Sequence, residues 1–227
     1  MSLDRYSIPE RTSLQTRTIP TTTHGRYLVE IPEHSRATLV AFHGYQENAA
    51  IAFEVLRQVV GARPAGLVSI QGLHRFYTRA NDVVASWMTK EDRELAIGDN
   101  VAYVSAVLAA VAEESDMARP LIYVGFSQGV AMAYRAAVFV QRPCDGVIAL
   151  AGDVPPDVAS IASTLPPVLI GRGAQDQWYT ADKAAADLTT LGAGGVRVSE
   201  YVFDGGHVWA PEFISRAGAF VDELLSS

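Results

Sequence analysis

The strongest constraint on the fold is the sequence Gly-Phe-Ser-Gln-Gly at residues 125–129, which lies between two segments of different periodicity. Residues 121–124 before it are continuously apolar, as in a buried strand, and residues 130–137 after it follow an Ala-rich helical pattern. Glycine two positions to either side of the serine leaves room for a sharp turn from strand to helix. The pattern therefore predicts that Ser127 lies at the carboxyl edge of a sheet, at a helix N-terminus that favours negative charge.

Short apolar runs alternate with helical patterns through the rest of the chain. Runs that are apolar throughout suit a parallel sheet covered on both faces. The expected strands are 26–31, 37–42, 67–70, 121–126, 146–150, 168–170 and 196–203, and the expected helices are 49–60, 98–118, 128–141, 181–191 and 211–225. This rhythm predicts right-handed βαβ units in one doubly wound α/β domain spanning residues 1–227.

Three segments do not follow this rhythm. Residues 13–19 could form an edge strand that pairs with 26–31 through a turn at 21–25. Residues 71–94 and 153–167 are irregular, and either could form part of a cleft wall.

Composition narrows the class of protein. With 227 residues, 49% of them hydrophobic, the chain can bury a self-sufficient core. Its net charge of −7 without a basic run argues against a nucleic-acid partner, and a single cysteine excludes an internal disulfide. The first ten residues lack the apolar region of a signal peptide, and no apolar run reaches the ~18–20 residues of a membrane span. We expect a cytoplasmic protein that is a monomer or a weak homodimer.

A serine hydroxyl needs a general base, and the base needs an orienting acid. His207 is the only histidine downstream of Ser127, and it follows the last expected strand in the sequence Asp-Gly-Gly-His. Asp176 lies in the loop after 168–170, where the order serine, acid, histidine places the acid. Asp153, after the preceding strand, is the alternative acid. The arrangement predicts attack of Ser127 on an acyl carbonyl.

Such attack also needs two backbone N–H groups to hold the oxyanion. One comes from Gln128, the residue after the nucleophile. We assign the other to Tyr45, because the loop after residues 37–42 begins with His43-Gly44. The His43 ring is expected to be buried and bonded to the loop backbone.

These segments together resemble the phospholipase/carboxylesterase family, which includes bacterial carboxylesterases and acyl-protein thioesterases. The resemblance extends from about Arg36 onward and rests on residues 43–44, 125–129, 173–176 and 205–207. It implies an α/β-hydrolase fold with little or no lid, catalysis by Ser127, Asp176 and His207, and neither metal nor organic cofactor. It also implies activity on short to medium acyl esters, thioesters or lysophospholipids.

Aromatic residues accompany the expected catalytic loops. Trp178 follows the acid, Trp209 follows the histidine, and Trp87 lies in an irregular segment. Aromatic walls suit an apolar or aromatic ester, so we expect these three residues to line the substrate site. Arg75, Arg79 and Arg172 could bind a carboxylate or phosphate, or could pair with surface acids.

Two other functions are compatible with the same residues. A peptidase or amidase would use the same triad, and sequence does not separate amide from ester hydrolysis. A non-catalytic relative could keep the fold and bind a small ligand.

Overall fold

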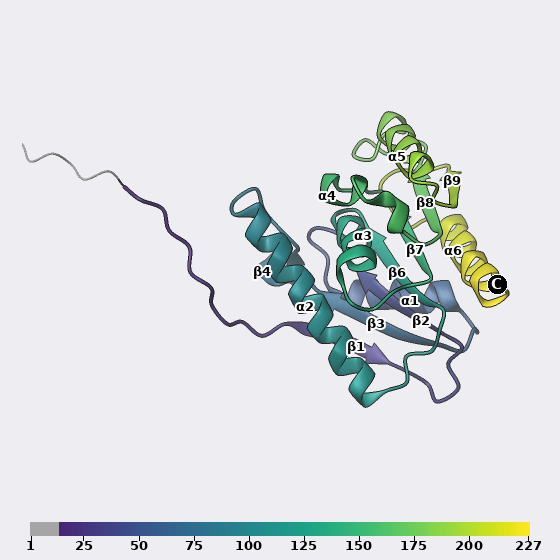
Figure 1. Ribbon diagram of the computed structural model, residues 1–227, viewed down its shortest axis with the longest axis horizontal. Helices are drawn as coiled ribbons and strands as arrows, with labels where there is room; N and C mark the ends of the chain where they lie inside the picture. Colours follow the sequence, from purple (N-terminus) through teal and green to yellow (C-terminus); the bar gives the residue numbers. More distant parts are fainter. Residues whose placement is uncertain (1–13) are drawn as a thin grey trace, which may run out of the picture.

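A computed structural model describes residues 14–227 and shows a seven-stranded sheet (Figure 1). All neighbouring strands are parallel except the antiparallel pair β1–β3 at one edge. The strand order is β1 (Arg26–Glu30), β3 (Ala65–Gln71), β2 (Ala37–Phe42), β6 (Leu121–Phe126), β7 (Gly146–Leu150), β8 (Val168–Gly173) and β9 (Val198–Phe203). The expected mostly parallel sheet between helices is confirmed.

Helices cover both faces of the sheet (Figure 1). The helix α1 (Ala49–Val60) packs on α6 (Pro211–Leu225), and α2 (Arg93–Glu114) packs on α3 (Gln128–Phe139). The remaining helices are α5 (Ala181–Ala193), the short α4 (Pro156–Ala159) and the 3₁₀ turn η1 (Ala162–Thr164). Every residue of the strands β2, β3, β6 and β7 is buried, because helices shield these strands on both sides.

The helix α2 is long and apolar enough to cross a membrane by length and composition alone. Core helices of globular domains pass the same test, so this is weak evidence for a span. Val104, Leu108 and Val111 on α2 are buried in the hydrophobic core of the domain.

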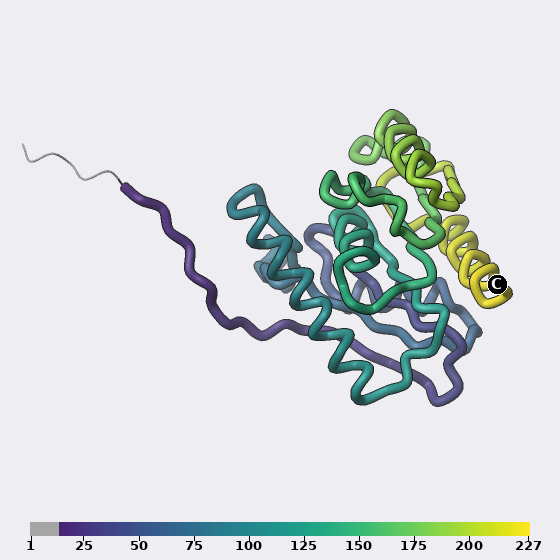
Figure 2. The backbone as a smooth tube through the Cα atoms, in the orientation of Figure 1, coloured from purple at the N-terminus to yellow at the C-terminus, as the bar shows by residue number. Residues whose placement is uncertain are grey.

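The structure corrects three expectations. Residues 14–25 form no strand, and the first of them lie away from the body of the molecule (Figure 2). Residues 1–13, which include Ser13, lie outside the described residues. The strand β1 pairs with β3 instead. The irregular segment 71–94 contains an antiparallel hairpin of β4 (His74–Tyr77) and β5 (Val83–Ser86), and α2 begins at Arg93 rather than at residue 98.

Candidate active site

Ser127 occupies a strained turn between β6 and α3. Its backbone has φ 52° and ψ −119°, a region that side-chain-bearing residues rarely adopt. The N–H of Ser127 donates to Leu150 O at 2.9 Å, which fixes the turn on the neighbouring strand β7. A Cβ atom at Gly125 would collide with Gly129 O, and one at Gly129 would collide with Phe42 O. Both glycines are therefore required by close backbone approach, as the motif predicts.

His207 and Asp176 are joined by a hydrogen bond of 2.9 Å between Nδ1 and Oδ2. The other carboxylate oxygen of Asp176 accepts the backbone N–H groups of Trp178 at 2.8 Å and Tyr179 at 3.0 Å. The Asp176 side chain is fully buried, whereas that of His207 is 24% exposed. A carboxylate held by three donors fixes the imidazole with Nδ1 toward the acid and Nε2 free for proton transfer.

The histidine lies beside the serine turn. The ring of His207 is 5.0 Å, centroid to centroid, from the ring of Phe126, the residue before Ser127. Within residues 14–227, the hydrogen bond of the His207 ring goes to Asp176, and none joins this ring to Ser127 Oγ. The alternative acid, Asp153, pairs instead with Lys183 at 3.2 Å, and both side chains are about half exposed.

The loop after β2 is held by its own side chains. His43 is fully buried, with Nδ1 2.6 Å from Gly44 O and Nε2 accepting the N–H of Gly72 at 2.9 Å. Burial lowers the pKa of His43 to about 4. The Gly44 N–H donates to Glu47 Oε2 at 2.7 Å, and burial raises the pKa of Glu47. The His43 ring, expected to be buried and bonded to the loop backbone, is thus a structural anchor of this loop.

The two backbone donors that sequence assigns to the oxyanion are free in this structure. Within residues 14–227, neither the N–H of Tyr45 nor that of Gln128 has an acceptor. The next residue, Gln46, has φ 63° and donates its own N–H to Ala85 O at 3.2 Å. That left-handed turn and its contact with β5 hold the loop in place beside the serine.

The side chain of Gln128 has a role that the sequence does not reveal. Its Oε1 accepts the N–H of Trp87 at 2.8 Å and the hydroxyl of Ser86 at 3.2 Å, and its Nε2 donates to Met88 O at 3.1 Å. The first residue of α3 therefore holds the end of β5 against the serine turn. The Gly-Phe-Ser-Gln-Gly sequence indicates the turn, but only the folded chain shows what this glutamine contacts.

The three tryptophans have different environments. Trp87 is fully buried, donates Nε1–H to His43 O at 2.9 Å, and therefore offers no surface to a ligand. The expectation that Trp87 lines the substrate site is not met, because the hairpin packs this ring into the core. Trp178 is 75% exposed. The ring of Trp209 packs at a tilt against that of Phe126, with 5.9 Å between the ring centroids, and Trp209 lines a small cavity with Glu47.

Among residues 14–227, no group of three or more His, Cys, Asp or Glu side chains could hold a metal ion. Of the arginines considered, Arg172 donates to Gly173 O at 3.2 Å, Arg79 is exposed, and Arg75 lines a separate pocket.

The sheet, the serine turn and the order of the site residues define an α/β-hydrolase. Solved structures share this fold: esterase PE8 has a TM-score of 0.70 at 23% identity over 88% of this chain and 98% of its own. Acyl-protein thioesterase 2 of Zea mays gives 0.67 at 20% identity over 89% and 100%, and the Bacillus cereus carboxylesterase gives 0.70 at 16% over 88% and 94%. No curated protein sequence matches the chain significantly.

The sequence matches the phospholipase/carboxylesterase family over residues 26–222. The chain therefore belongs to this family and is a carboxylic ester hydrolase.

Proposed function

We propose that the enzyme hydrolyses esters through an acyl-enzyme formed on Ser127. His207 takes the hydroxyl proton as the oxygen attacks the carbonyl, and the N–H groups of Tyr45 and Gln128 stabilise the oxyanion. His207 then protonates the leaving alcohol or thiol, and water releases the acid in the same way. The observation that carries the proposal is the buried Asp176 carboxylate, which orients His207 beside the strained serine turn.

The surroundings of His207 support an apolar or aromatic acyl ester of short to medium length. The ring of Phe126 packs against the imidazole, the ring of Trp209 packs against Phe126, and Tyr45, in the loop after β2, is 54% exposed. Aromatic side chains present large apolar surfaces with little conformational freedom to lose. Thioesters and lysophospholipids belong to the same proposal, because the acyl carbonyl is attacked in the same way.

The first test is hydrolysis of p-nitrophenyl acetate, butyrate and octanoate by the wild-type enzyme and by Ser127→Ala. We expect turnover in the wild type and its loss by a factor of about 10⁴ or more in the variant, because removal of a triad member leaves only oxyanion and binding effects. Circular dichroism should show the same fold for both proteins. Undiminished turnover by folded Ser127→Ala would exclude Ser127 as the nucleophile.

p-Nitroanilides with the same acyl groups as the esters distinguish amide hydrolysis from ester hydrolysis. Amide turnover as fast as that of the corresponding ester would favour a peptidase or amidase on the same triad. No turnover of any ester by the folded protein would favour a non-catalytic ligand-binding role.

We also propose that the enzyme is cytoplasmic, acts as a monomer or weak homodimer and has no nucleic-acid partner. The acidic balance supports the absence of a nucleic-acid partner, and the single cysteine supports the cytoplasmic location.

A further inference from the structure

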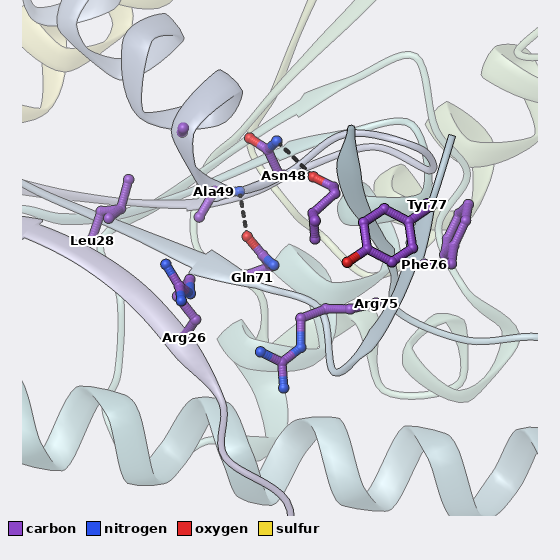
Figure 3. Close-up of a pocket in the computed structure, with 10 residues that line it drawn as sticks. Arg26, Leu28, Asn48, Ala49, Gln71, Arg75, Phe76 and Tyr77 are labelled. Atoms are coloured by element: carbon purple, nitrogen blue, oxygen red, sulfur yellow. Dashed lines mark hydrogen bonds between the residues drawn. The ribbon is translucent and has the colours of Figure 1, made fainter. Parts of the chain in front are cut away.

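A pocket of about 560 Å³ lies between β1, the start of α1 and the β4–β5 hairpin (Figure 3). None of Ser127, Asp176 and His207 lines it. Its volume falls within the range of about 300–1,000 Å³ that small-molecule sites occupy. The pocket is therefore large enough for an organic ligand and separate from the catalytic residues.

The pairing of β1 with β3 explains why a hollow exists here. Arg26 pairs with Gln71 and Leu28 with Ser69, so these four side chains share one face of the sheet. That face points toward the start of α1, because Ser69 Oγ donates to Ala49 O at 2.8 Å and Gln71 Oε1 accepts the Ala49 N–H at 3.3 Å. Since α1 begins only at Ala49, it leaves the Arg26 end of β1 uncovered.

One side of the pocket carries positive charge. Arg26 enters from β1 and Arg75 from β4, and both guanidinium groups lie near Gln71 in Figure 3. No Asp or Glu lines the pocket, and neither arginine forms an ion pair within residues 14–227. Arg75 uses Nη2 to donate to His24 O at 3.1 Å, which leaves its other N–H groups available.

The start of α1 adds to the positive electrostatic potential of the pocket. Its first turn contains no acidic residue, and Asn48 and Ala49 both line the pocket. The Asn48 side chain caps the helix by accepting the N–H of Ile51 at 3.1 Å. Because Asn48, Ala49 and Ala50 line the pocket, the positive end of the helix dipole lies at the same hollow as the two arginines.

The rest of the lining is mostly apolar. Phe76, Tyr77 and Val83 of the hairpin line the pocket, and Tyr77 and Val83 are 69% and 44% exposed. Leu28 lies on the same face of β1 as Arg26. A guanidinium pair next to apolar side chains suits a ligand with an anionic head and an apolar body. The planar fork of arginine matches a carboxylate in a bidentate arrangement.

We propose that this pocket binds an aliphatic or aromatic carboxylate, with the carboxylate on Arg26 and Arg75 and the body against Tyr77 and Val83, which share a face of the hairpin with Arg75. The acid released by ester hydrolysis has this chemistry, so the inference rests on the proposed function for the origin of the ligand but not for its binding. Phe76, on the other face of β4, has its ring 5.7 Å from that of Tyr45, so the hairpin that lines the pocket also packs on the loop after β2.

Calorimetric titration of the full chain with octanoate, 1-octanol, octyl phosphate and inorganic phosphate tests the assignment. We expect saturable 1:1 binding of octanoate that Arg26→Gln and Arg75→Gln each weaken about tenfold, since each removes a charge-assisted hydrogen bond. Arg79→Gln, the same change at an exposed position of the same hairpin that does not line the pocket, should bind octanoate like the wild type. Octanol and inorganic phosphate should bind at least tenfold more weakly than octanoate.

Three results would overturn the proposal. Unchanged octanoate affinity in both Arg26→Gln and Arg75→Gln would show that the two arginines do not bind the carboxylate. Octanol binding as tight as octanoate binding would show that the pocket does not require an anion. Octyl phosphate binding tenfold tighter than octanoate would assign a phosphate in place of the carboxylate.

Kinetics distinguish this pocket from the catalytic site. With p-nitrophenyl acetate as substrate, any competitive inhibition by octanoate at Ser127 should be the same in the wild type and in Arg26→Gln, whereas loss of that competitive inhibition in Arg26→Gln would place the arginine at the catalytic site and overturn the inference. If no ester is hydrolysed, the proposed function fails, and the titrations still decide the binding site.

Discussion

Two aspartates follow neighbouring strands at the carboxyl edge of the sheet, Asp153 after β7 and Asp176 after β8. Their side chains have opposite environments: Asp176 is buried and accepts three hydrogen bonds, whereas Asp153 is half exposed and pairs with Lys183. A carboxylate can orient an imidazole only if it is itself fixed. The structure therefore favours Asp176 for reasons that the sequence order alone does not contain.

The Asp176→Asn variant tests this role. The amide oxygen can still accept from Trp178 and Tyr179, but the amide N–H₂ group would then face His207 Nδ1 and favour the wrong tautomer. We expect kcat on p-nitrophenyl butyrate to fall by about 10³- to 10⁴-fold with little change in KM. The matched control Asp153→Asn should retain wild-type kcat; a large loss in the control and none at Asp176 would reverse the assignment.

At the scale of elements, the position of the β4–β5 hairpin depends on the side chain of Gln128. This side chain makes three hydrogen bonds to residues 86–88, and the isolated bridge between Glu47 and Ala85 joins the same hairpin to the oxyanion loop. The helix α3, the hairpin and the loop after β2 are thereby linked around the serine turn.

Gln128→Ala removes these bonds and keeps the backbone N–H that we propose for the oxyanion. Because the N–H of Trp87 would lose its acceptor, we expect a loss of about 1–3 kcal/mol in the free energy of unfolding, measured by urea denaturation. Gln58→Ala, at an exposed position of α1, is the control and should change stability by less than about 0.5 kcal/mol. Equal stability of the two variants would show that the Gln128 side chain does not hold the hairpin.

The sequence predicts the elements whose pattern is local. The buried strands around the serine turn and the helices α1 and α6 match their predicted ranges closely, because continuous apolar runs and helical periodicity are readable from neighbours in the chain. The hairpin in 71–94 has no such pattern, and its existence depends on contacts with Glu47 and Gln128 far away in sequence. The burial of Trp87, which the sequence leads us to expect at the substrate site, also depends on these distant contacts and could not be predicted.

The same distinction between local patterns and distant contacts applies to the site. The order serine, acid, histidine and the glycines of the turn can be predicted from fold rules and spacing, and the structure brings Asp176 and His207 together at 2.9 Å. The pocket over β1 and β3 could not be predicted, because the expected partner of β1 is the segment 13–19. In the structure β1 pairs with β3, and Arg26 lies opposite Gln71.

At the scale of the whole molecule, the buried His43 couples stability to pH. Its Nε2 accepts the N–H of Gly72, so Nδ1 carries the proton and donates to Gly44 O. Adding a second proton would place Nε2–H against the N–H of Gly72 in a fully buried site, which agrees with the lowered pKa of about 4. The unfolded chain protonates this histidine near its ordinary value of 6.5.

Between pH 6.5 and about 4 the unfolded chain therefore binds more protons at this position than the folded chain, and stability falls as the pH falls through this window. The difference between these two pKa values corresponds to about 3 kcal/mol. Burial raises the pKa of Glu47 and of Asp187, and these two groups make stability rise as the pH falls. The wild type must therefore be compared with His43→Gln, in which the effects of Glu47 and Asp187 remain. Urea unfolding at pH 7.5, 6, 5 and 4 should show the wild type losing about 3 kcal/mol more than His43→Gln across this range. Parallel curves for the two proteins would mean that His43 is protonated equally readily in the folded and unfolded states, which would contradict its role as a neutral anchor of the oxyanion loop.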